Sequence, residues 1–325
     1  MARTGEPGLP PWIVEGAGSR IAVLGADGFI GSWVVRAALA AGAEVRALAV
    51  KEPWRLPAAA PGLSIARIPD GRWWEAAGEV ETALDGADAL ALLAYAPPPD
   101  RAPDAWFEHE MSVNTAGAET VAGAAARAGA RVVFASSADV YGSWRDGTLA
   151  DDDEPAPVTP YSRAKLEAER LVGSADRSNL SLRIGTVYGP GENGPRAIPA
   201  FIRAHLAGGP AVIHGEGTDV KDYVHVADVA GAFVNACLGG AAEWPTANVG
   251  SGRGRTTLEV LEAVREAAGA DLPVEHGEST RAPSRIVLGT ARAEGSLGFS
   301  ARADFVAALA EEIAWIDAHT TNAQG

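Results

Sequence analysis

The sequence RIAVLGADGFIGSWVVRAALAAGAEVRALAV, from Arg20 to Val50, decides the fold. It begins with an apolar run, continues through a glycine-rich turn into a segment with apolar residues at helical spacing, and ends with a second apolar run. This order predicts a strand, a tight turn, a helix and a second strand. Together these elements make a βαβ unit, whose two strands run parallel.

Apolar runs of the same kind recur along the first half of the chain, at LSIARI (63–68), ALALLAY (89–95), RVVFASS (131–137) and LSLRIGTVY (180–188). Segments of small residues such as 114–129 separate them and are expected to be helical. The alternation predicts an α/β protein with a Rossmann-type, doubly wound parallel sheet. After Pro190, short strands and a late helix (256–269) predict a smaller C-terminal lobe that is interleaved with the sheet domain.

The expected domain organisation follows from this pattern. Residues 1–18 are rich in Gly and Pro and are expected to form a flexible leader. A dinucleotide-binding domain is expected over residues 19–185. The substrate-binding lobe is expected mainly over residues 186–318, and residues 319–325 are expected to form a frayed tail.

Composition excludes several classes of function. The net charge of −15, from 42 acidic and 27 basic residues, disfavours nucleic acid as a partner because most of the surface would repel phosphate. No segment is long and apolar enough to span a membrane. The single cysteine, Cys237, and the absence of metal-ligand spacing predict no intrachain disulfide and no metal site. A cytoplasmic location is expected.

The turn GADGFIG places Gly25, Gly28 and Gly31 between a strand and a helix. Without side chains at these positions, the backbone can turn tightly and let a pyrophosphate approach the helix N-terminus. A tight turn alone would explain the glycines, but the flanking strands favour a dinucleotide site.

The end of the second strand leaves the choice between NAD and NADP open. An NAD site usually has a carboxylate there, whereas this chain has Ala49, followed by Lys51 and Arg55. Those cations suit a 2′-phosphate, although they are equally well explained as solvated side chains. Asp70 and Gly71, after the third strand, are placed to contact the adenine, but an Asp-Gly turn explains them almost as well.

Tyr161 and Lys165 lie four residues apart in TPYSRAKLEAERL, which reads as the start of a helix. At this spacing the ammonium lies beside the phenol. Together with a positively charged nicotinamide, it is expected to lower the tyrosine pKa and make Tyr161 a general acid or base. The pair alone is weak evidence because the spacing is common in helices. Ser136 and Ser137 end the strand RVVFASS, and strand C-termini in such a sheet face the ligand crevice. A serine there can bind the oxygen that Tyr161 protonates, or merely cap a turn.

These motifs, in this order, resemble the extended short-chain dehydrogenase/reductases, which include nucleotide-sugar epimerases, dehydratases, decarboxylases and ketoreductases. The resemblance runs from about Arg20 to Ala293 through GADGFIG, SSADVYG, YSRAK, LRIGTVYGPG, KDYVHVADVA and RAPS. It implies that Ser137, Tyr161 and Lys165 are catalytic. It also implies further cofactor contacts at Phe29, Ile30, Leu93, Ala94, Asn114 and Tyr188, although an N-cap role explains Asn114 nearly as well.

The resemblance also suggests how the substrate binds. Lys221 and Arg281 match positions that contact the diphosphate, and Thr186 stands where many relatives have a substrate-binding asparagine. Tyr95, Trp106, Trp144 and Tyr188 are candidates for lining the sugar pocket, although packing would explain each of them. The family further implies a homodimer, built from segment 115–129 and the helix of Tyr161.

The residues after Ser137 bear on the reaction. Family dehydratases have an Asp-Glu pair there, whereas this chain has Ala138 and Asp139, which disfavours dehydration. Related decarboxylases have a glutamate at the position of Asp139, a candidate substrate contact that a turn role also explains. The expected function is 4-epimerisation of a nucleotide-linked hexose, with reduction of a 4-keto sugar by NADPH as the alternative. A decarboxylase, a reductase of a non-nucleotide ketone and a non-catalytic dinucleotide sensor are less favoured.

Overall fold

The computed structural model describes residues 8–240, 243–279, 282–302 and 304–321. The first βαβ unit is present as predicted, with β1 (Arg20–Leu24), α1 (Phe29–Ala40) and β2 (Glu44–Ala49). The strands that follow are β3 (Leu63–Arg67), β4 (Ala89–Leu92), β5 (Arg131–Ser137), β6 (Leu180–Ile184), β7 (Thr186–Tyr188), β8 (Ala211–His214), β9 (Val220–His225), β10 (Thr246–Val249), β11 (Gly254–Thr256), β12 (Val274–Gly277) and β13 (Arg285–Ile286). The remaining helices are α2 (Ala77–Leu84), α3 (Pro103–His109), α4 (Ala116–Ala128), α5 (Pro160–Ala175), α6 (Ala197–Leu206), α7 (Val226–Leu238), α8 (Thr257–Ala268), α9 (Ala291–Leu297) and α10 (Phe305–Thr321).

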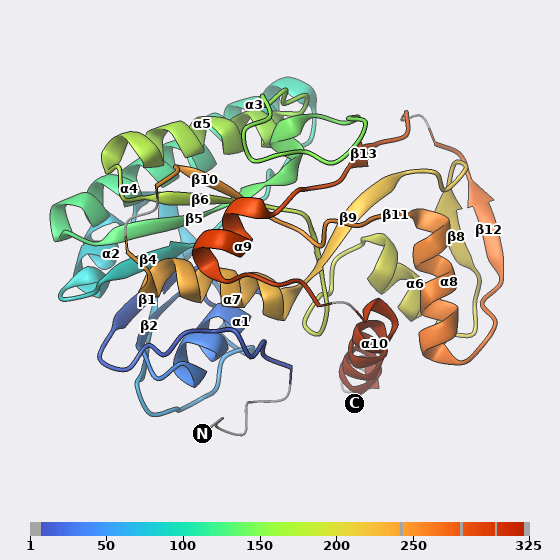
Figure 1. Cartoon of the computed structure of the whole chain (residues 1–325), viewed down its shortest axis with the longest axis horizontal. Helices are drawn as coiled ribbons and strands as arrows, with labels where there is room; N and C mark the ends of the chain where they lie inside the picture. Colours follow the sequence, from blue (N-terminus) through green and yellow to red (C-terminus); the bar gives the residue numbers. More distant parts are fainter. Residues whose placement is uncertain (1–7, 241–242, 280–281, 303, 322–325) are drawn as a thin grey trace.

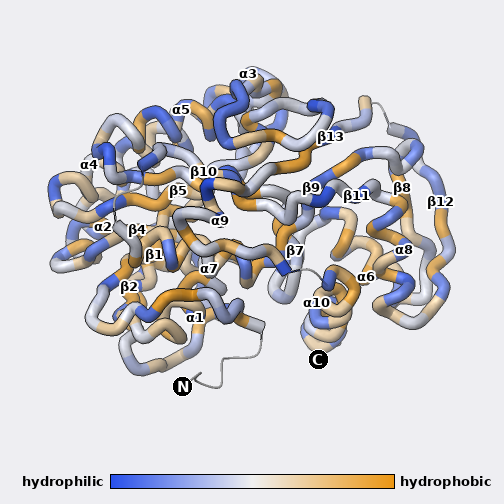
Figure 2. Tube along the Cα trace, viewed as in Figure 1, coloured by the Kyte–Doolittle hydropathy of each residue, from blue (hydrophilic) through white to orange (hydrophobic). Residues whose placement is uncertain are grey.

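The main sheet has seven strands in the order β10-β6-β5-β4-β1-β2-β3, and all of its strand pairs are parallel. This order confirms the predicted doubly wound fold, because chain connections reverse direction between β1 and β4. Helices α2, α4 and α5 pack side by side on one face, while α1 packs against α7 on the other (Figure 1). The central strands β1, β4 and β6 are mostly hydrophobic (Figure 2) and buried, because both faces of the sheet are covered.

The smaller lobe contains β8 and β12, together with α6, α8 and α10, and it lies beside the C-terminal ends of the main strands (Figure 1). Its core includes Phe201, Ile213, Leu261 and Leu309. Two elements from the second half of the chain return to the main domain. Strand β10 pairs with β6, and α7 packs on α1, so the two parts are interleaved.

Residues 8–18, expected to belong to a flexible leader, instead pack against the main domain. The ring of Trp12 lies 5.6 Å from that of Phe299, and its indole nitrogen donates to the carbonyl of Ser300. Leu9 and Ile13 pack on the core around α1 and α7. These apolar side chains hold the segment in place despite its Gly and Pro content. At the other end α10 continues through residues 319–321, which were expected to be frayed.

Candidate functional site

The glycine loop between β1 and α1 forms a cradle that requires the absence of side chains. Gly25 has a φ of +88°, and a Cβ there would lie 2.7 Å from the backbone nitrogen of Ala94. A Cβ at Gly31 would lie 2.1 Å from the carbonyl oxygen of Gly25. Gly28 is the N-cap of α1, with its nitrogen donating to Gly25. The backbone is therefore shaped for a pyrophosphate at the N-terminus of α1, as the sequence predicts.

The other residues predicted to contact the cofactor surround this cradle. Leu93 and Ala94 follow β4, where Leu93 donates a backbone hydrogen bond to Leu24. Phe29 and Ile30 begin α1 and pack against the core beneath it. These positions border the reversal point between β1 and β4, where α/β sheets bind ligands.

Residues after β2 and β3 complete the adenosine side. The exposed side chain of Lys51 follows β2. Asp70 has a left-handed φ of +53°, and a Cβ at Gly71 would lie 2.9 Å from the carbonyl oxygen of Val50. Gly71 is therefore required where the chain after β3 passes close to the end of β2. Contact of these residues with the adenine stays a prediction.

The three predicted catalytic residues come together at the C-terminal end of β5. Ser137 is the last residue of β5, and Tyr161 and Lys165 lie in the first turns of α5, which packs against that strand. The capping box of Thr159 and Ser162 fixes where α5 begins. Ser136 does not join them, because its hydroxyl donates to the buried Glu169, which is ion-paired with Arg183.

Lys165 is oriented by the backbone of β5. Its ammonium donates to the carbonyl of Ala135 at 2.8 Å and lies 5.8 Å from the centre of the Tyr161 ring. Burial lowers the pKa of Lys165 to about 8, although Glu110 and Glu169 act to raise it. The ammonium is therefore still mostly protonated at neutral pH.

The protein groups alone raise the pKa of Tyr161, so the predicted lowering by Lys165 together with a positively charged nicotinamide stays a prediction. Burial raises the pKa of this phenol, and the negative charge of Asp139 adds to the effect. A side-chain hydrogen bond with Ser137 acts in the opposite direction but is outweighed.

A buried carboxylate beside the site was missed by the sequence analysis. Glu110 is fully buried and accepts hydrogen bonds from the Tyr95 hydroxyl at 2.6 Å, the Trp106 indole at 2.9 Å and the Asn114 amide at 2.9 Å. The Tyr95 ring packs edge-on against the Tyr161 ring at 5.5 Å. The spacing of residues 106, 110 and 114, which places all three on one helix face, was a signal that could have revealed this cluster.

Asn114 lies inside a π-helical segment, Glu110–Thr115, that continues into α4. It is therefore not an N-cap. Its side chain accepts from the backbone nitrogen of Ala96 and donates to the carbonyl of the same residue, both at 2.9 Å. Asn114 thus holds the segment that follows β4, and direct contact with a cofactor stays a prediction.

Two of the predicted substrate residues, Thr186 and Lys221, lie on strands of the small sheet that contains β9. Thr186 begins β7 and pairs with Tyr223 of β9, while Lys221 lies opposite Arg255 of β11. Asp139 is exposed and lies two residues after Ser137, which ends β5. Arg281 lies outside the described residues.

Tyr188 lines a cavity of about 400 Å³ together with Tyr223 and Arg255, whereas Trp144 does not. Tyr188 is buried in an aromatic cluster with Tyr223, His225 and Phe305. Trp144 is exposed beside β13. Contact of Tyr188 with the cofactor stays a prediction.

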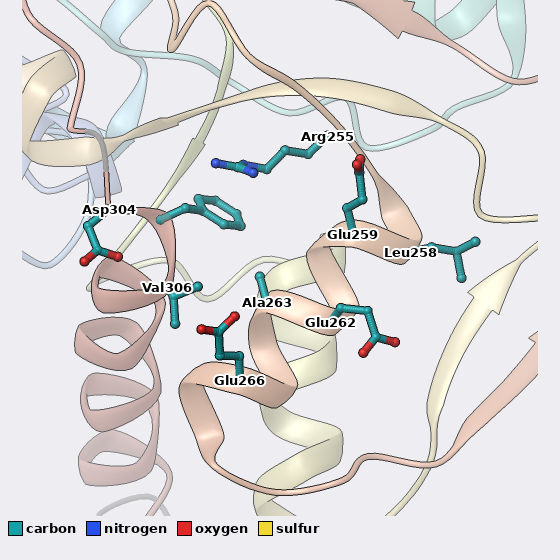
Figure 3. Close-up of a pocket in the computed structure, with 9 residues that line it drawn as sticks. Arg255, Leu258, Glu259, Glu262, Ala263, Glu266, Asp304 and Val306 are labelled. Atoms are coloured by element: carbon teal, nitrogen blue, oxygen red, sulfur yellow. The ribbon is translucent and has the colours of Figure 1, made fainter.

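A cavity of about 720 Å³ lies between α8 and α10 (Figure 3). Its lining includes four carboxylates, from Glu259, Glu262, Glu266 and Asp304, and none of the predicted site residues. It is unsuited to a nucleotide sugar, because the carboxylates would repel a diphosphate. In the described part of the chain, no cluster of His, Cys, Asp and Glu is arranged to hold a metal ion, and no helix is long and apolar enough to cross a membrane.

Comparison with known proteins agrees with this geometry. A model of the NAD dependent epimerase/dehydratase family matches residues 21–250. The chain is 29% identical to a UDP-glucose 4-epimerase of Lacticaseibacillus casei, over 91% of this chain and 95% of the relative. It is 31% identical to a dTDP-glucose 4,6-dehydratase of Streptomyces griseus, over 93% and 95%. The solved structure of MoeE5 in complex with UDP-glucuronic acid and NAD is 29% identical, with a TM-score of 0.78 over 93% of this chain and 100% of that one.

Proposed function

Because the chain belongs to the NAD-dependent epimerase/dehydratase family of nucleotide-sugar enzymes, we propose that it catalyses 4-epimerisation of a nucleotide-linked hexose. The observation that carries the proposal is the meeting of Ser137, Tyr161 and Lys165 at the end of β5, next to the glycine cradle. This arrangement can move a proton on a hydroxyl group while the cofactor is held alongside.

The catalytic residues handle the proton and the oxygen at C4. The Tyr161 phenolate accepts the proton of the C4 hydroxyl and later returns it, so the proton balance over the whole reaction is zero. The Ser137 hydroxyl holds the same oxygen by a hydrogen bond. NAD, which the cradle of Gly25, Gly28 and Gly31 would hold, would supply the hydride acceptor and donor that inversion at C4 requires.

Lys165 has a specific part in this scheme. Because burial raises the pKa of Tyr161, the phenolate needs a nearby positive charge. The Lys165 ammonium is held close to the ring by Ala135, and it remains mostly protonated at neutral pH. We infer that Lys165 stabilises the phenolate rather than exchanging protons with the sugar.

The segment after Ser137 favours epimerisation over dehydration. Ala138 is buried and has no group that could remove a proton from C5 or protonate a leaving hydroxyl. Asp139 is the one carboxylate of this pair, and it is exposed. The relatives include enzymes of both kinds, so this local chemistry is what favours the epimerase.

The test is to incubate the purified enzyme with UDP- and dTDP-hexoses, without added cofactor, and to follow the product mass and the C4 configuration by NMR. A product of unchanged mass with inverted C4 supports the proposal. A product lighter by one water or by one carbon dioxide would show dehydration or decarboxylation instead. A 4-keto sugar that is converted only when NADPH is added would support the ketoreductase.

We also propose that the enzyme is a homodimer assembled through α4 and α5. These two helices lie side by side on one face of the sheet (Figure 1). Sedimentation analysis at micromolar concentration tests this, and a monomer would contradict it.

A further inference from the structure

Asp27, in the middle of the glycine loop, turns its side chain onto the C-terminal end of β2. One carboxylate oxygen accepts from the backbone nitrogen of Val50 at 2.7 Å, and the other accepts from that of Lys51 at 3.0 Å. The residue is only 6% exposed. The carboxylate is therefore fixed at the C-terminal tip of β2, which has no acid at that end because the strand finishes at Ala49.

The tip of β2 is where a dinucleotide fold distinguishes its cofactors. A carboxylate at this place accepts hydrogen bonds from the ribose hydroxyls of NAD and disfavours the 2′-phosphate of NADP. Each oxygen of Asp27 has one hydrogen bond from the protein, and a carboxylate oxygen can accept two. We propose that Asp27 supplies from the glycine loop the carboxylate that β2 lacks, and that it makes the enzyme selective for NAD over NADP.

The nearby cations do not provide a ready phosphate site. The guanidinium of Arg55 donates to the carbonyl oxygens of Asp27 and Gly191, at 3.4 and 3.3 Å, and lies over the ring of Trp54. It therefore ties the glycine loop to the segment after β7. Lys51 is exposed, but its backbone amide is occupied by the Asp27 carboxylate. A 2′-phosphate here would meet a negative charge already bound to the two amides that it needs.

Without the Asp27 carboxylate, the tip of β2 would favour NADP over NAD. Removing the charge leaves the amides of Val50 and Lys51, together with the cations of Lys51 and Arg55, facing the ribose. Amides and cations of this kind bind phosphate. One carboxylate therefore decides between the two cofactors at this site.

The test compares cofactor binding in the wild type and in Asp27→Asn, by isothermal titration with NAD⁺ and NADP⁺. We expect the wild type to bind NAD⁺ at least about tenfold more tightly, and the ratio of the two dissociation constants to fall at least about tenfold in the variant. Asp27→Ser is the second variant. It is neutral but keeps one acceptor for the amides, so it replaces Asp27→Asn if that protein does not fold.

Glu52→Gln is the matched control, because Glu52 is an exposed acid shortly after β2 whose carboxylate pairs with Arg67. The ratio of its two dissociation constants should stay close to that of the wild type. The proposal is overturned if the wild type prefers NADP⁺, if neither folded Asp27 variant changes the ratio, or if Glu52→Gln changes it equally. Binding is measured without substrate, so the result is independent of whether the enzyme is an epimerase.

Discussion

Two carboxylates buried between the main domain and the lobe should make the stability of this enzyme depend on pH. Glu192 lies in the loop after β7, and Glu312 lies in α10. Both side chains are almost completely buried. Glu192 is ion-paired with Arg196 at 2.9 Å, whereas neither oxygen of Glu312 has a hydrogen bond of ordinary geometry. Burial raises the pKa of both groups, and the charge of Glu192 raises that of Glu312 further.

The magnitude can be worked out for Glu192, whose pKa rises from 4.5 to about 7. A folded-state pKa above the unfolded value means that the folded protein holds the proton more tightly. Its contribution is therefore full at low pH and is lost as the pH rises through this interval. Between pH 5.5 and 8.5 the loss amounts to about 2 kcal/mol of unfolding free energy.

The test variant is Glu192→Gln. Glutamine has nearly the same shape as glutamate but does not titrate. Urea unfolding followed by tryptophan fluorescence at pH 5.5 and 8.5 gives the unfolding free energies, and both values lie above the isoelectric point of about 4.8. Between pH 5.5 and 8.5 the unfolding free energy of the wild type should fall by about 2 kcal/mol more than that of the variant. Glu275→Gln, in an exposed strand, should behave as the wild type. Equal pH dependence in the wild type and Glu192→Gln would refute the reasoning.

Four further predictions concern the catalytic site. Tyr161→Phe should fold normally and lower kcat by about 10²- to 10⁴-fold, and near-normal turnover would exclude Tyr161 as the acid-base group. Gly31→Ala should abolish NAD binding in a titration, because its Cβ would collide with the carbonyl of Gly25, so retained binding would contradict the cradle. Glu110→Gln removes a charge that raises the pKa of Lys165. The fall in kcat above about pH 8 should therefore begin at lower pH, and an unmoved pH profile would mean that Glu110 acts only in packing. Lys221→Ala should raise KM for the nucleotide sugar far more than it lowers kcat, and an unchanged KM would remove Lys221 from the diphosphate site.

Much of the site could be predicted because a parallel sheet places strand ends at one edge. Ser137 ends β5, and the capping box sets the start of the Tyr161 helix, so local patterns were enough to bring the two together. The glycine cradle was also predictable from a local pattern, because Gly25 and Gly31 belong to one short strand-to-helix turn.

Other features depend on where distant segments meet, and local patterns do not contain that information. Glu192 and Glu312 are far apart in the sequence. Both are buried because of the way α10 packs. The carboxylate of Asp27 was visible in the glycine motif, but its contact with Val50 depends on the exact path of the loop. The effect of burial on the Tyr161 pKa could not be predicted locally, because it depends on the distant segments that pack around the phenol.

The segment Gly189–Glu192 connects the cofactor cradle to the lobe, which links cofactor binding to the geometry of the substrate side. The Trp33 indole of α1 donates to the carbonyl of Pro190 at 2.8 Å, and Arg55 donates to that of Gly191. The next residue is Glu192, whose ion pair with Arg196 holds the start of α6. We therefore expect a cofactor that holds the glycine loop and Arg55 in place to hold the segment on which α6 begins as well. Since α6 is part of the lobe core, NAD bound first should prepare the nucleotide-sugar side for its substrate.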